Sequence, residues 1–156
     1  MSAVVQTPEL WVRPMTSRDL EAVMRIELAM YQFPWTQRIF KDCLRVGYRC
    51  HVGEVEGNLA GYGVMSTGAN EAHILNVCVA EEFQRRGLAR EILSHLLDEA
   101  DTLEVRDVFL EVRPSNTPAV SLYEQMGFNQ VGLRKDYYPT AHGREDAIIY
   151  ALSLRL

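Results

Sequence analysis

The chain has 156 residues, of which 47% are apolar and 24% charged, and its formal net charge is -5. This length and composition suit one globular domain with a substantial hydrophobic core, over residues 1–156. The negative charge argues against a general nucleic-acid-binding protein, which usually carries a basic face. It is compatible with a cationic or amine substrate.

The cysteines and the hydrophobic pattern bear on metal binding, redox state and location. Cys43, Cys50 and Cys78 form no CxxC pair and the 4 histidines are scattered, so zinc-type spacing is absent. Three cysteines cannot all pair within one chain, which favours reduced thiols in a cytoplasmic protein. No apolar run approaches the roughly 18–20 residues of a membrane span, and the start "MSAVVQTPEL" lacks the basic region of a signal peptide. We expect a cytoplasmic protein without a metal or a membrane partner.

The first half of the chain carries clear helix and strand signals. Thr16 and Asp19 have the spacing of a capping box, and Thr36 is a second N-cap residue. Pro34 is unfavourable inside a helix and separates the two helices, while Gly47 closes the second one. Further on, short apolar runs joined by the turn "EGN" are typical of strands. In order, we expect a strand, two helices and three strands over residues 9–15, 16–30, 36–45, 48–55, 59–67 and 72–79.

The second half predicts two more helices and three more strands. Apolar residues in "LAREILSHLLDEADTL" recur at three- and four-residue spacing, which is typical of a helix with one buried face. Gly127 marks the end of the last helix. In order, these elements cover residues 88–103, 107–112, 117–126, 128–135 and 146–154, with a loop over 136–145. A mixed sheet with helices on both faces, in one small α/β domain, satisfies the whole order.

The stretch "QRRGLARE", residues 84–91, places two arginines and a glycine directly before a helix. The first N–H groups of a helix lack partners within it, and the helix dipole adds partial positive charge there, so this end suits a phosphate group. Gly87 lets a ligand approach the backbone, and Arg85 and Arg86 add positive charge. No Walker motif occurs, and "GYGVMS" lacks the third glycine of a dinucleotide motif. Similar strings also arise at helix starts by chance, so the motif alone leaves a purely structural role open.

Two longer segments carry a family resemblance. "VCVAEEFQRRGLAREIL" resembles the acetyl-coenzyme A signature Q/R-x-x-G-x-G/A of the GCN5-related N-acetyltransferase (GNAT) superfamily, matched by Gln84, Gly87 and Ala89. "FLEVRPSNTPAVSLYEQMGF" is similar to the second coenzyme-binding segment of that superfamily. With "FPW" near the front and "DYYPTAHGREDAIIYAL" near the end, the chain from about Leu10 to Leu154 is most similar to the bacterial RimI-type ribosomal-protein-alanine N-acetyltransferases. The signature is shared by the whole superfamily and therefore indicates the cofactor, not the acceptor.

The resemblance implies a fold and a cosubstrate, acetyl-CoA. The fold would be a central, mostly antiparallel mixed sheet of about seven strands flanked by about four helices. Backbone N–H groups of residues 85–90 would bind the pyrophosphate, and the strand at residues 77–79 would lie along the pantetheine arm. Cys78 is interpreted as a small buried apolar residue rather than as a covalent nucleophile. The implied coenzyme-binding residues are Val77, Cys78, Val79, Arg85, Arg86, Gly87, Leu88, Ala89, Arg90, Asn116 and Tyr123.

Glu111 and Tyr123 are the candidate catalytic residues. Glu111 lies in the otherwise apolar strand "DVFLEV", where a carboxylate is costly unless it is paired or used, and burial would raise its pKa toward that of a useful base. Simple alternation with Phe109 leaves a solvated or paired glutamate as the alternative. The spacing of Tyr123 permits core packing. The resemblance implies that Glu111 accepts the amine proton and that Tyr123 donates a proton to the coenzyme sulfur.

The acceptor is less determined by the sequence. An α-amino group titrates near 8 and a lysine near 10.4, so a lysine costs roughly 3 kcal/mol more to deprotonate, which favours an N-terminal amine. In the superfamily the loops at residues 31–35 and 136–145 often line the acceptor site, so the resemblance makes Phe33 and Tyr138 candidate substrate contacts. A packed cap over the sheet is the alternative, and His142 is interpreted as a solvated loop residue.

Three functions are compatible with these signals. The leading one is acetyl-CoA-dependent acetylation of the N-terminal alanine of a protein, which by the resemblance is ribosomal small-subunit protein S18. The same fold and cofactor could instead serve lysine side chains or a small amine. A non-catalytic acetyl-CoA sensor is the third, although pure binding needs neither Glu111 nor Tyr123. None of the three requires direct contact with nucleic acid or a membrane.

Overall fold

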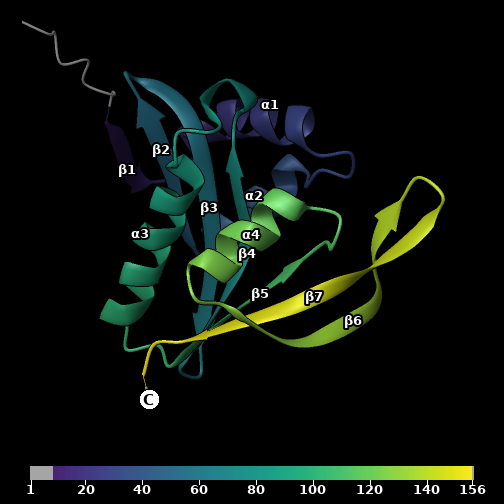
Figure 1. The fold of residues 1–156 in the computed structure, drawn as a ribbon. Helices are drawn as coiled ribbons and strands as arrows, with labels where there is room; N and C mark the ends of the chain where they lie inside the picture. Colours follow the sequence, from purple (N-terminus) through teal and green to yellow (C-terminus); the bar gives the residue numbers. More distant parts are fainter. Residues whose placement is uncertain (1–8, 156) are drawn as a thin grey trace, which may run out of the picture.

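The structure is a computed structural model and describes residues 9–155 (Figure 1). Its strands are β1 (Leu10–Pro14), β2 (Arg49–Val55), β3 (Asn58–Gly68), β4 (Glu71–Val79), β5 (Asp107–Val112), β6 (Asn129–Thr140) and β7 (Gly143–Ser153). Its α-helices are α1 (Leu20–Met30), α2 (Gln37–Arg45), α3 (Leu88–Thr102) and α4 (Thr117–Gln125). Two short 3₁₀ helices, η1 (Ser17–Asp19) and η2 (Glu81–Phe83), precede α1 and α3.

The strands form one sheet in the order β1-β2-β3-β4-β5-β7-β6. Within residues 9–155, β4 and β5 form the parallel pair and every other neighbouring pair is antiparallel. Helices α1 and α2 cover one face, and α3 and α4 cover the other (Figure 1). The expected mixed, mostly antiparallel sheet with helices on both faces is confirmed. No helix in this part of the chain has both the length and the apolar character needed to cross a bilayer.

Local signals place the helix ends where the sequence predicts them. The Asp19 carboxylate accepts a hydrogen bond of 2.7 Å from the backbone N–H of Thr16, as in a capping box. The Thr36 hydroxyl caps α2, and Gly47 follows that helix with a φ of 83°. One detail differs, because the turn after Thr16 is the 3₁₀ helix η1 and α1 proper begins at Leu20.

The hydrophobic core lies on both sides of the sheet. On the side of α1 and α2, the rings of Phe40 and Tyr62 meet edge to face with centroids 5.6 Å apart. On the side of α3, the side chains of Ile92, Leu93 and Leu96 are at most 1% exposed. Burial of each such side chain stabilises the fold by about 1.5–3 kcal/mol. The buried stripe expected for this helix is therefore present.

The prediction of a loop over residues 136–145 is wrong. β6 and β7 pair on both sides of a bulge and continue to a tight turn at residues 141–142. In the bulge, Asp136 has a φ of 53° and its backbone N–H donates to the Asp146 carboxylate at 2.9 Å. This bond across the hairpin lets the ladder resume after the extra residues, so Tyr138 lies in a strand and not in a loop.

The parallel strands β4 and β5 separate before either of them ends. Their last rung joins Ile74 and Leu110, whereas β4 continues to Val79 and β5 to Val112. β4 also carries a bulge at residue 75 in its ladder with β3, and bulges bend a strand. The sheet is therefore open along the C-terminal half of β4.

Candidate active site

The loop before α3 leaves its backbone N–H groups free. The Gln84 side chain donates to the carbonyl of Val79 at 3.1 Å and ties the loop to the end of β4. Arg85 and Gly87 have φ values of 66° and 77°. Within the described chain, the N–H groups of residues 85–90 have no acceptor. A helix start with free N–H groups suits a phosphate, and the structure brings the residues predicted for the pyrophosphate together there.

The residues predicted for the pantetheine arm lie where β4 has left β5. Val77, Cys78 and Val79 pair with β3, but no described strand pairs with them on the β5 side. An extended group with amides can pair there as an added strand would. Burial raises the pKa of the Cys78 thiol to about 11, against the opposing influence of the nearby hydroxyls of Tyr62 and Tyr31. The thiol is therefore neutral near pH 7, which disfavours a nucleophilic role.

Helix α4 carries the predicted residues Asn116 and Tyr123. The Asn116 side chain accepts a hydrogen bond of 3.4 Å from the N–H of Ala119 and is the N-cap of α4, a role that needs no coenzyme. The ring of Tyr123 packs against Phe128 and Tyr150, with centroids 5.8 and 6.4 Å away. Burial raises the pKa of Tyr123 to about 12. Its hydroxyl is protonated at neutral pH and makes no hydrogen bond to the described residues.

Glu111 is a buried carboxylate with two partners. Its side chain is 8% exposed, one oxygen is hydrogen-bonded to His73 Nε2, and the other lies 3.2 Å from Arg134 Nε. Burial raises the pKa of Glu111, but the hydrogen bond and charge of His73, with the charge of Arg134, lower it by more. The expected upward shift is therefore wrong, because the sequence pattern shows the burial and not the partners. Glu111 is ionised at neutral pH.

The two candidate catalytic residues approach the opening between β4 and β5 from opposite faces of the sheet. Leu110 and Val112 pack in the cluster that also contains Tyr123 on α4. Because side chains alternate along a strand, Glu111 points to the other face. A carboxylate on one face of the sheet and a hydroxyl on the other therefore lie near the place where β4 and β5 separate.

Arg113 brings the two predicted substrate contacts together. Its guanidinium lies 4.5 Å from the ring centroid of Tyr138 and 5.9 Å from that of Phe33. It also pairs with Glu145 at 3.1 Å. Burial raises the pKa of the Tyr138 phenol above its usual value, so this hydroxyl remains a donor. The segment between α1 and α2 and the β6–β7 hairpin therefore meet over the end of β5.

Sequence reasoning missed Glu27, which is 2% exposed on α1. Its carboxylate accepts hydrogen bonds from the Tyr62 hydroxyl at 2.6 Å, the Asn76 amide at 3.0 Å and the Trp35 N–H at 2.9 Å. These bonds fix the segment containing Phe33 against β4. A signal was present, since Glu27 follows Val23 by four residues on the apolar side of its helix.

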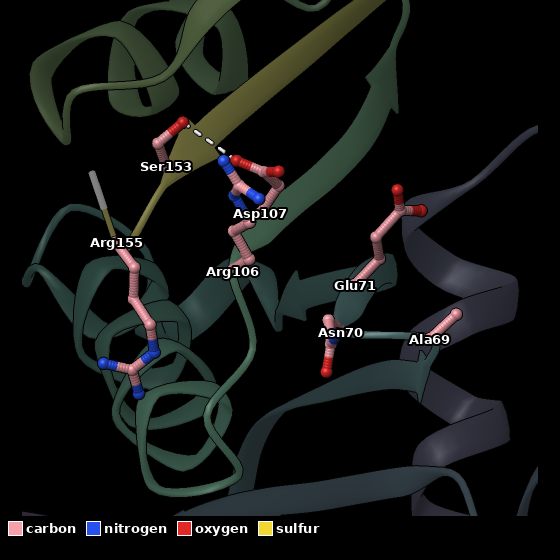
Figure 2. A pocket seen from close by; sticks show the side chains of 7 residues that line it. All are labelled: Ala69, Asn70, Glu71, Arg106, Asp107, Ser153 and Arg155. Carbon is pink, nitrogen blue, oxygen red and sulfur yellow. Dashed lines mark hydrogen bonds between the residues drawn. The ribbon is translucent and has the colours of Figure 1, made fainter.

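A separate polar hollow lies at the other end of the parallel pair, where β4 and β5 begin (Figure 2). It has a volume of about 470 Å³ and is lined by Ala69, Asn70, Glu71, Arg106, Asp107, Ser153 and Arg155. None of the predicted site residues lines it, and Ser153 donates to Asp107 across its wall at 2.9 Å. Within residues 9–155, no group of three or more His, Cys, Asp or Glu side chains is placed to hold a metal ion.

The chain matches one family model and is similar to proteins of known name and structure. The model of the Acetyltransferase (GNAT) family matches residues 18–128. The chain is 39% identical to the [ribosomal protein bS18]-alanine N-acetyltransferase of Salmonella typhimurium over 91% of its own length and 96% of the relative. It is 37% identical to the protein of the same name from Escherichia coli, over 93% and 98%. The crystal structure of the ribosomal-protein-S18-alanine N-acetyltransferase from Escherichia coli superimposes with a TM-score of 0.89 at 36% identity, over 95% of this chain and 96% of that one.

Proposed function

The chain belongs to the Acetyltransferase (GNAT) family, and from this premise we propose that it transfers the acetyl group of acetyl-CoA to the N-terminal alanine of ribosomal protein bS18. The relatives that carry this name are 37% and 39% identical and are covered almost from end to end. A ribosomal-protein substrate implies a cytoplasmic reaction. We also propose that residues 1–156 act as one catalytic domain.

The residues of the opening fit acetyl-CoA, the acetyl donor of the GNAT family. The free N–H groups of residues 85–90 suit a diphosphate. The edge of β4 at Val77 to Val79 suits an arm that contains amide groups. Bound there, acetyl-CoA supplies a thioester carbonyl. The N–H groups of the open edge are the candidates for polarising that carbonyl.

The observation that carries the proposal is the placement of Glu111 and Tyr123 on opposite faces of this opening. The ionised Glu111 accepts a proton from the attacking amine, directly or through a water molecule. The protonated Tyr123 donates its hydroxyl proton to the departing thiolate. The lowered pKa of Glu111 makes it a weak base, which suits an α-amine near 8 better than a lysine near 10.4.

The acceptor enters from the face that carries Glu111. Phe33, Arg113 and Tyr138 form the wall of that entrance. Tyr138 is partly buried and its ring carries a hydroxyl, so it offers both an apolar surface and a hydrogen bond to the first residues of a peptide. Arg113 is paired with Glu145, which leaves the wall close to neutral.

Two short basic peptides test the proposal. One has a free N-terminal alanine and no lysine, and the other has a blocked N-terminus and contains lysine. Each is incubated with acetyl-CoA and the protein, and peptide mass and thiol release are followed together. We expect acetylation of the first peptide alone. Acetylation of the second alone would assign a lysine acceptor, and binding of acetyl-CoA without any transfer would leave the small-amine and sensor functions.

A further inference from the structure

His73 lies on β4 one rung before β4 and β5 separate. The ladders pair it with Ser66 of β3 and Phe109 of β5, so strands on both sides hold its backbone. Phe109 and Glu111 share a face of β5 because they are two residues apart. The His73 side chain lies on that same face, and its Nε2 is hydrogen-bonded to Oε2 of Glu111.

The two partners of Glu111 differ in how firmly they are held. Arg134 lies on the edge strand β6, beside the bulge, and its long side chain is 54% exposed. Such an exposed ion pair restricts its partner weakly. His73 lies on a central strand, has a short ring side chain, and is 35% exposed. Of the two, His73 is the partner that can fix the orientation of the carboxylate.

We propose that His73 is a positioning residue of the acetyl transfer, which holds one oxygen of Glu111 so that the carboxylate faces the acceptor amine. This inference rests on the proposed function. A carboxylate only accepts hydrogen bonds, so Nε2 of His73 carries the proton. If the carboxylate can rotate away from the geometry of the reaction, acetyl transfer becomes slower, whereas the affinity for the coenzyme stays the same.

The pKa of Glu111 provides a second test of the positioning role, besides the rate of acetyl transfer. β4 presents His73, β6 presents Arg134 and the Tyr138 phenol, and β7 presents the apolar Ile149 beside it in the ladder. Burial raises the pKa of Glu111, and His73 is the largest influence that lowers it. Removal of His73 therefore raises the pKa of Glu111, and the acidic limb of the activity profile moves to higher pH.

Steady-state kinetics with the alanine peptide test the positioning role. We expect His73→Ala to lower kcat about 10- to 100-fold, because a misplacement of the reacting groups by about 1 Å can cost about 10²-fold, with KM for acetyl-CoA unchanged. His73→Gln keeps an N–H donor at the same reach and recovers most of kcat. The matched control is His95→Ala, an exposed histidine of α3, which leaves kcat unchanged. A wild-type kcat in His73→Ala, or a loss that His73→Gln does not reverse, overturns the inference.

Titration of the Glu111 carboxyl carbon by NMR separates this inference from the proposed function. The protein is labelled with ¹³C-glutamate, and Glu111→Gln identifies the signal. We expect the midpoint of Glu111 to rise in His73→Ala and to return toward the wild-type value in His73→Gln. An unchanged midpoint overturns the inference even if the peptide is acetylated. Absence of acetyl transfer by the wild-type protein overturns the proposed function instead.

Discussion

The hydroxyl of Tyr62 donates a hydrogen bond of 2.6 Å to Oε1 of Glu27, although the two side chains are only 0% and 2% exposed. The same carboxylate also accepts from Asn76 and from the backbone of Trp35. A buried carboxylate is tolerated when it is fully hydrogen-bonded. Glu27 thus joins α1 and β3 to β4 and to the segment that leads into α2, and the last two carry predicted site residues.

Loss of the Glu27 carboxylate should destabilise the fold. Glu27→Ala leaves one buried donor, Tyr62, and two partly buried donors, Trp35 and Asn76, without their acceptor, and we expect the free energy of unfolding to fall by about 3 kcal/mol. The control is Glu21→Ala on the same helix, whose exposed side chain makes one ion pair with Arg25 at 3.7 Å and should have no measurable effect. Urea unfolding of both variants checks this. Equal stability of the two would contradict the role assigned to Glu27.

The candidate base and acid should each contribute to the rate. Glu111→Gln and Tyr123→Phe remove one proton-transfer group each, and we expect kcat on the alanine peptide to fall about 10²- to 10⁴-fold. Affinity for acetyl-CoA, measured by calorimetry, should change little, because Glu111 is outside the predicted coenzyme-binding residues and Tyr123→Phe keeps the aromatic ring. As a control, Glu56→Gln in the turn between β2 and β3 should keep the full rate. Wild-type turnover in Glu111→Gln would remove this glutamate from the mechanism.

Gly87 allows a matched test of the phosphate site. Gly87 and Gly57 have φ values of 77° and 80°, and an added Cβ would meet no atom within 4 Å at either position. Alanine at each should therefore cost about 1 kcal/mol of stability through the backbone alone. Only Gly87→Ala should weaken acetyl-CoA binding, by about tenfold or more, because strain there displaces the free N–H groups. If calorimetry gives the same affinity for both variants, the phosphate does not bind at this loop.

Tyr138 should affect binding of the acceptor peptide and not binding of acetyl-CoA. Tyr138→Ala removes the ring that stacks on Arg113 at 4.5 Å, and we expect KM for the alanine peptide to rise about tenfold, the loss of a contact of roughly 1.4 kcal/mol. KM for acetyl-CoA should stay the same. Tyr48→Ala, a 39% exposed tyrosine after α2, serves as the control. A rise in both KM values would instead indicate a general disturbance of the hairpin.

The dependence of stability on pH should report the Asp19 carboxyl. Its hydrogen bonds with Arg13, at 2.7 and 2.9 Å, hold the pKa of Asp19 below its ordinary value. A lowered folded-state pKa adds stability above the unfolded value of about 3.9, and this stability is lost as the pH falls through the folded pKa. Asp19→Asn should therefore be less stable than wild type at pH 7, with the difference closing below about pH 4. Urea unfolding over a pH series checks this, and a difference that is constant with pH would rule the effect out.

Features set by neighbouring residues were predictable from the sequence. The N-caps at Thr16 and Thr36, the glycine after α2 and the apolar stripe of α3 all depend on contacts within one or two turns. The motif from Gln84 to Ala89 was readable for the same reason, since the free N–H groups of a helix start are a local property.

Features set by pairing between strands, and by side-chain partners on other strands, were not predictable. The bulge at Asp136 depends on Asp146, and "DYYPTAHG" reads locally as a loop because it contains a proline and a glycine. The contact between His73 and Glu111 spans 38 positions and exists because β4 and β5 are parallel neighbours across α3. Burial of Glu111 alone suggests a raised pKa, and the two partners reverse that direction.

Intact bS18 with a free N-terminal alanine gives the most direct test of the proposed function. The purified protein would be incubated with acetyl-CoA and bS18, and the product analysed by intact mass and by fragmentation of its N-terminal peptide. We expect one acetyl group, located on the α-amine of the alanine, and far less of this product in the same time when Glu111→Gln replaces the wild type. An unmodified bS18, or acetyl groups on its lysines alone, would contradict the assignment.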